Sequence, residues 1–211
     1  MPHPFIPIDP PPTEPNFSWS DWDPYAAVGS PPVDRVEELG LCSDRALVAY
    51  TIALAEWVVH RFKNMLDDTI PIHFLQAAWV SEIDPHVNPP PESDEANWKG
   101  PMRGSIDLAL MTVLNAMASM DGGKPEVDAA LAEQIAGHIW NWSPSFVAWR
   151  DVVVPRLQRV FPRQRDDRRP VAPAMFTTAG YDPRDTEAQI SAFLASVNFE
   201  ENFFLKPTGP P

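Results

Sequence analysis

The stretch SIDLALMTVLNAMASM, residues 105–120, decides the fold class because it is the most apolar segment of the chain. Placed on a helix, its apolar side chains cover most of the circumference and leave only a narrow polar stripe, formed by Asp107, Thr112, Asn115 and Ser119. A helix that is apolar on nearly all sides is buried among other elements. We therefore predict that 105–120 is the central helix of a compact domain.

Further helical segments flank this stretch on both sides. Apolar side chains recur every three to four residues in 44–66, 70–83, 125–141, 144–161 and 186–197. Ser43 and Ser143, the latter followed by Pro144, are residue types that begin helices. A short turn is expected at 34–41, and 162–184 is expected to be a long irregular segment, either functional or disordered. No alternation typical of strands occurs, so the predicted fold is an all-α single domain of five to six helices.

The distribution of proline divides the chain into three parts. Ten of the 26 prolines lie in residues 1–33, together with several aromatic residues and no lysine or arginine. Because a solvated linker contains few aromatic residues, we expect this extended arm to lie over the core, with the surface of a partner as the alternative. Residues 34–205 are then the helical domain, and residues 206–211 are a flexible tail.

The chain is strongly acidic, with 29 acidic against 16 basic residues and a net charge of −13. Binding to a nucleic-acid backbone or to anionic lipid requires a basic face, so both classes of partner are disfavoured. A basic protein partner is favoured by long-range attraction, although acidity is also typical of a protein that is merely soluble.

The remaining composition favours a cytoplasmic protein of bacterial origin. The single cysteine, Cys42, excludes an intramolecular disulfide and is interpreted as a buried structural thiol. The first residues lack the basic and apolar regions of a signal peptide, and no apolar run reaches the length of a membrane span. The excess of arginine over lysine, with abundant alanine and proline, is typical of a GC-rich bacterial genome.

The sequence contains no standard catalytic or cofactor motif, and we expect no cofactor. One pair of side chains is a candidate for catalysis, with Asp107 as a general base near His138; the alternative for Asp107 is an acid that stabilises the helix dipole. A second pair, Glu56 and His60, lies one helical turn apart and is a candidate for holding a metal ion. The alternative for this second pair is an exposed pair on the solvent face of its helix.

Two sets of side chains are candidates for binding a partner. The aromatic residues of the arm and an acidic run before the apolar helix supply them, namely Trp19, Trp22, Tyr25, Glu92, Asp94 and Glu95. A basic run follows later in the chain and consists of Arg150, Arg156, Arg159, Arg163, Arg165, Arg168 and Arg169. Since the acidic remainder repels nucleic acid, we interpret this run as an internal or oligomeric electrostatic partner, with binding of nucleic acid or another phosphate as the alternative.

These observations leave three functional hypotheses. The acidity, the missing catalytic motifs and the aromatic arm favour an acidic protein-binding module that masks a basic partner, of the general type of bacterial immunity proteins and antitoxins. The alternative is a structural subunit of a larger assembly, including a homo-oligomer, which predicts large exposed apolar patches. The second alternative is an enzyme with an unfamiliar Asp/His site, which requires at least two of the candidate side chains to converge in one pocket.

Overall fold

A computed structural model describes residues 14–65, 67–92, 99–120, 122–164 and 167–205. Within these ranges the chain forms seven α-helices and no strand, which confirms the all-α class. The α-helices are α1 (Val33–Leu39), α2 (Asp44–Phe62), α3 (Ile70–Ile83), α4 (Gly100–Ser119), α5 (Pro125–Ile139), α6 (Pro144–Val160) and α7 (Thr186–Ser196). Three short 3-10 turns follow α6 and α7, namely η1 (Pro173–Phe176), η2 (Pro183–Asp185) and η3 (Phe203–Leu205).

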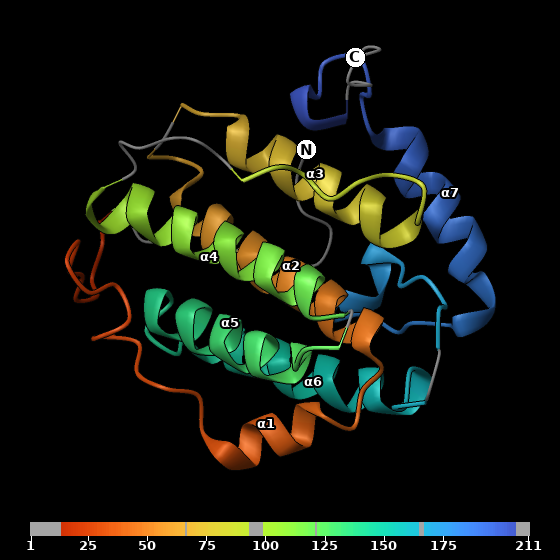
Figure 1. The fold of residues 1–211 in the computed structure, drawn as a ribbon, viewed down its shortest axis with the longest axis horizontal. Coiled ribbons are helices and arrows are strands. Elements are labelled where there is room, and N and C mark those ends of the chain that lie inside the picture. The colour runs from red at the N-terminus through yellow and green to blue at the C-terminus, as the bar shows by residue number, and fades with distance from the viewer. Residues whose placement is uncertain (1–13, 66, 93–98, 121, 165–166, 206–211) are drawn as a thin grey trace.

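One helix lies at the centre and packs against the others, but this helix is α2. Every residue of α2 from Ala46 to Phe62 is buried, and α3, α4 and α5 all pack against it (Figure 1). The stretch 105–120, which we expected at the centre, lies almost entirely in α4 and packs on α2 and α5. Its outer side remains exposed at Asn115 and Ala118. The polar residues of α2 find partners inside the protein, and this explains why its sequence pattern underestimates its burial.

The helix starts follow the residue types that the sequence offers. The side chains of Ser43 and Ser143 accept hydrogen bonds from the backbone N–H groups of Ala46 and Phe146, each at 3.4 Å. Helix α4 begins at Gly100, five residues before the expected start, because Pro101 is tolerated in a first helical turn.

The described part of the N-terminal arm lies on the helical body. Residues 14–32 run past one end of α4 and α5 toward α1 (Figure 1). Phe17 packs against Phe62 with ring centroids 6.1 Å apart, and the Ser18 carbonyl accepts a hydrogen bond from the imidazole of His138 on α5. Residues 1–13 of the expected arm and all of the expected tail, 206–211, lie outside the described residues.

The irregular segment after α6 belongs largely to the core. Val171, Ala172, Met175 and Phe176 are fully buried, and the Trp149 indole donates a hydrogen bond to the Phe176 carbonyl at 2.7 Å. Residues 171–176 are therefore neither a disordered loop nor an exposed functional loop. Their apolar side chains cover one side of the helical core.

Candidate functional site

An open groove lies between α4 and the turn formed by residues 19–25 of the arm. Its volume is about 430 Å³, which is within the usual range of ligand sites. Its lining consists of Trp19, Asp21, Pro24, Tyr25, Lys99, Gly104, Asp107, Leu108, Met111 and Asn115. We call it the arm groove. It brings together two of the aromatic residues expected to bind a partner and the candidate acid Asp107.

One face of α4 supplies the floor of the arm groove. Gly104, Leu108, Met111 and Asn115 follow one another at intervals of three or four residues, so they lie on the same side of the helix. Gly104 allows the arm to approach closely, since a Cβ atom at this position would collide with the indole ring of Trp19. The absence of a side chain at Gly104 therefore sets the depth at which the arm docks.

Asp21 fastens the arm turn to the start of α4. Its carboxylate accepts hydrogen bonds from the Trp19 indole N–H at 2.8 Å and from the Gly100 backbone N–H at 2.7 Å. The hydrogen bond from Trp19 is the largest cause that lowers the pKa of Asp21, followed by the bond from Gly100 and the charge of Lys99. The Asp21 carboxylate therefore stabilises the shape of the groove, because its two hydrogen bonds link the Trp19 indole to the start of α4.

Asp107, unlike Asp21, has a carboxylate that accepts no hydrogen bond from the described residues. It is half-buried in the groove. Burial raises the pKa of Asp107, and the negative charge of Glu92 adds to this effect. Burial also raises the pKa of Tyr25, with a contribution from the charge of Asp107. The groove therefore holds a negative charge that lacks a compensating partner within the described residues.

Two aromatic residues of the arm turn are exposed. Trp22 is 99% exposed and Tyr25 is 44% exposed, although both are large rings whose burial would be favourable. Glu92 is also exposed, whereas Asp94 and Glu95 lie outside the described residues. An exposed tryptophan three residues before a half-exposed tyrosine is typical of a contact surface for another molecule.

The structure does not place His138, the expected partner of Asp107, in the lining of the arm groove. Its Nε2 atom lies 2.8 Å from the Ser18 carbonyl, and its ring packs edge-on against Phe17 with centroids 5.6 Å apart. The carbonyl only accepts, so Nε2 carries the proton and donates. The docked arm thus occupies the imidazole that a catalytic pair would need.

The candidate metal pair, Glu56 and His60, is buried, so its interpretation as an exposed pair on the solvent face is wrong. The Trp79 indole donates a hydrogen bond to Glu56 at 2.9 Å, and the His60 ring stacks on Trp140 with centroids 6.3 Å apart. In the described ranges no third acidic, histidine or cysteine side chain joins this pair to form a group that could hold a metal ion. Both side chains are instead polar members of the core.

The basic run makes contacts within the same chain. Arg156 donates to the carbonyls of Met175, Thr177 and Ala179 at 2.8, 2.6 and 2.9 Å. Arg163 lies 3.3 Å from both Asp44 and Glu126, and Arg169 forms an ion pair with Asp167 at 2.7 Å. These contacts favour the internal electrostatic interpretation. Arg165 lies outside the described residues.

Cys42, Trp140 and Trp149 are structural. Cys42 is completely buried, as expected, and burial raises the pKa of its thiol to about 12. A thiol with this pKa is protonated at neutral pH and is a poor nucleophile. Trp140 and Trp149 are buried, whereas Trp142 is 38% exposed at the corner between α5 and α6.

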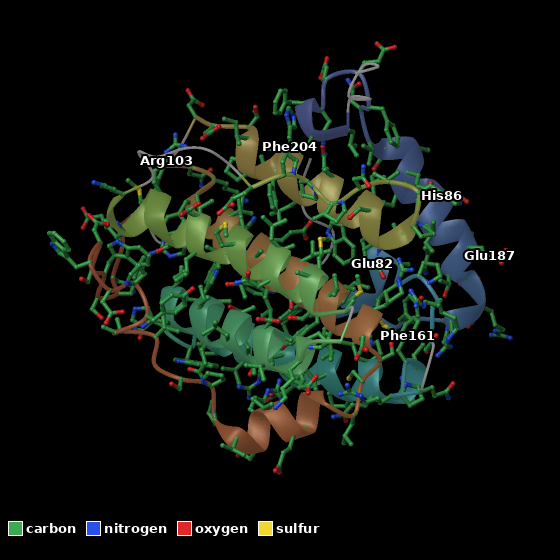
Figure 2. The ribbon with its side chains drawn as sticks, in the orientation of Figure 1. Glu82, His86, Arg103, Phe161, Glu187 and Phe204 are labelled. Carbon is green, nitrogen blue, oxygen red and sulfur yellow. The ribbon has the colours of Figure 1, made fainter. Side chains whose placement is uncertain are left out.

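Glu82 is a fully buried carboxylate near the end of α3, and it attaches the irregular segment to the helices (Figure 2). It accepts hydrogen bonds from Arg45 Nε at 3.2 Å and from the Val171 backbone N–H at 3.3 Å. Burial raises the pKa of Glu82 to about 7, and it outweighs the opposing effects of Arg45 and Val171. This carboxylate therefore titrates far above its ordinary range.

The raised pKa of Glu82 predicts a loss of stability as the pH rises from 4.5 to about 7. In this interval the folded protein still holds a proton that the unfolded chain has released, so a higher pH favours unfolding. The expected decrease in the free energy of unfolding is on the order of 3 kcal/mol. Urea unfolding at a series of pH values measures it. The Glu82→Gln variant lacks the titrating group and should lose this component; equal pH dependence in both proteins would contradict the assignment.

Sequence reasoning missed Asp21, Lys99 and Gly104, although all three shape the arm groove. The glycine near the start of an apolar helix was a usable signal, because glycine often marks a close approach of another chain segment. The roles of Asp21 and Lys99 depend on the docking of the arm against α4, which no local pattern reveals.

The structure can be compared with what each of the three functional hypotheses requires. Of the side chains proposed for an enzyme site, only Asp107 lines the arm groove. A structural subunit would gather its large exposed apolar residues in patches. In this chain they are found on several elements, namely the arm, α1, α5, the corner between α5 and α6, α6, and the segments after α1 and α7. The arm groove combines the exposed ring of Tyr25 with a carboxylate that has no ionic partner in the described part of the chain.

The chain matches no protein-family model, no curated protein and no solved structure. In the part of the chain that the structure describes, no helix is long and apolar enough to cross a membrane. We therefore infer the function from the arm groove and the chemistry of its residues.

Proposed function

We propose that this chain is an acidic binding module that holds a basic protein partner at the arm groove. The observation that carries the proposal is the groove itself, where the Asp107 carboxylate, which has no compensating partner among the described residues, shares the lining with Tyr25, and where Trp22 of the same arm turn is exposed. A cationic partner neutralises this carboxylate, and its apolar atoms cover the two rings. Both changes favour the complex.

The charge of the whole chain supports the same kind of partner. A net charge of −13 attracts a basic protein over long distances and accelerates its association. Several arginines of the basic run are already engaged by acidic or carbonyl groups of the same chain. Bacterial immunity proteins and antitoxins, which mask a toxin by stoichiometric binding, are the class we propose for this chain.

Trp22 is the expected centre of the binding energy. Tryptophan and tyrosine are enriched among the residues whose truncation weakens protein complexes most. Trp22 is almost fully exposed in the free chain, so a partner has its whole ring to cover. Replacing Trp22 with alanine is expected to weaken the complex by more than about tenfold.

A synthetic peptide array with graded net charge tests the proposal. The purified chain should be retained by peptides in proportion to their positive charge at low salt, and far less at high salt. The Trp22→Ala variant should show reduced retention on the same peptides. The matched control is Phe203→Ala, which removes another exposed ring from a turn packed on α3.

Two results would overturn the proposal. The first is that basic peptides are retained no better than acidic ones at low salt. The second is that Trp22→Ala and Phe203→Ala leave retention equally unchanged, because binding would then follow net charge and would not involve the arm groove.

A further inference from the structure

We infer that the arm groove receives one arginine side chain of the partner, whose guanidinium pairs with the Asp107 carboxylate beside the Tyr25 ring. This inference rests on the proposed function, because a basic partner must supply the arginine. It adds the chemical identity of the recognised group and the residue that selects it.

The shape of the groove suits a side chain with a long apolar stem. Leu108 and Met111 contribute apolar floor on the same face of α4 as Asp107. Arginine packs its methylene stem on apolar surface while its charged end reaches a polar partner. A volume of about 430 Å³ accommodates such a side chain.

The charges in the groove place the cation at Asp107. Asp21 is engaged by two hydrogen bonds and lies near Lys99, which repels a second cation at that end. The charge that acts on Asp107 is that of Glu92, which is negative, and Tyr25, which lines the groove with Asp107, is neutral at physiological pH. Arg103, one turn away on α4, forms its ion pair with Asp68. Asp107 is therefore the carboxylate that still lacks a positive partner among the described residues.

The aromatic rings favour arginine over lysine. A guanidinium is planar and weakly hydrated, so it stacks on an aromatic face and loses little when it leaves water. A lysine ammonium is strongly hydrated and pays more to approach a half-buried carboxylate. Tyr25 lines the groove, and Trp22 belongs to the same short turn, so exposed aromatic surface lies close to Asp107.

Isothermal titration calorimetry with two matched peptides tests the inference. Both peptides carry the same neutral residues and the same net charge, one with arginines and the other with lysines at the charged positions. We expect the arginine peptide to bind about tenfold more tightly to the unchanged chain. Asp107→Asn should remove this preference. The affinity for the arginine peptide should also rise with pH as Asp107 ionises, and this rise should be absent in Asp107→Asn.

The control for charge alone is Glu187→Gln. Glu187 is an exposed acid on α7, on the opposite side of the molecule from Arg103, which marks the first turns of α4 (Figure 2). This variant changes the net charge by the same amount as Asp107→Asn, and it should keep the preference for arginine. Thermal unfolding of both variants verifies that each is folded.

The possible results separate the inference from the proposed function. If both peptides bind equally well and Asp107→Asn changes neither, while Trp22→Ala weakens both, the basic partner stands and the arginine site is overturned. If neither peptide binds at low salt, the proposed function and the arginine site both fail. A preference for arginine that persists in Asp107→Asn would also overturn the role of Asp107.

Discussion

Replacing Glu133 with alanine is expected to lower the free energy of unfolding by about 3–5 kcal/mol. Glu133 lies on α5 with only 3% of its side chain exposed, and it contacts side chains of α1 and α2 as well as Arg150 of α6, at 3.8 Å. Its carboxylate accepts a hydrogen bond from the Tyr50 hydroxyl of α2 at 2.6 Å, and bonds from Arg35 Nε of α1 at 2.9 and 3.0 Å.

The size of this effect follows from what the substitution leaves behind. Burial, together with the charge of Glu133, holds the pKa of Tyr50 well above its ordinary value, so its hydroxyl stays protonated and needs an acceptor. The Arg35 guanidinium is 15% exposed and keeps its charge inside the protein. Alanine supplies neither an acceptor for Tyr50 nor the buried countercharge of Arg35, which would keep only the half-exposed Glu38 as a partner, and an underpaired buried charge is costly.

Chemical unfolding in urea measures the change, and Glu38→Ala is the matched control. Glu38 pairs with the same Arg35 but is 46% exposed, so its loss should cost less than about 1 kcal/mol. Glu133→Gln keeps an acceptor for Tyr50 and should fall between the two. If Glu133→Ala were no more costly than Glu38→Ala, the buried network would not hold α1, α2 and α5 together.

Replacing Arg156 with methionine is expected to cost about 2–4 kcal/mol, because three charge-assisted hydrogen bonds disappear together. Arg156 is buried in α6 and donates to three carbonyls of the segment that follows it, at Met175, Thr177 and Ala179. Methionine retains most of the apolar stem, so the change reports on the hydrogen bonds more than on packing. The Met175 carbonyl loses its donor in a buried environment.

Hydrogen exchange and urea unfolding distinguish a local from a global effect of Arg156→Met. Amide protection should decrease first in residues 170–180, since these carbonyls are held by Arg156. Arg159→Met is the control, because Arg159 lies on the exposed side of the same helix. Equal losses of stability in the two variants would contradict a special role for Arg156.

The helices were predictable because their signals are local. The expected range 70–83 coincides with α3, and the expected starts at Pro125, Pro144 and Thr186 coincide with those of α5, α6 and α7. Apolar periodicity and capping residues depend on neighbours within about one helical turn. These signals are present in the sequence before any tertiary contact forms.

The sequence predicted several individual residues of the candidate site, but not that they lie together. Trp19, Tyr25 and Asp107 were each recognised as candidates, but Asp107 was paired with His138 instead of with the arm. About 80 residues separate the arm turn from α4 along the chain, and no periodicity spans that distance. The docking of Trp19 against Gly104 brings the two together.

The sequence by itself determined the all-α class, the positions of the helices and the acidity that favours a basic partner. Only the tertiary structure decided that α2 is the central helix, that Glu56 and His60 are buried, and that Asp107 faces the arm. The physical reason is the range of the interactions. Helix formation is governed by neighbours along the chain, whereas a polar side chain becomes buried only when another element supplies its partner.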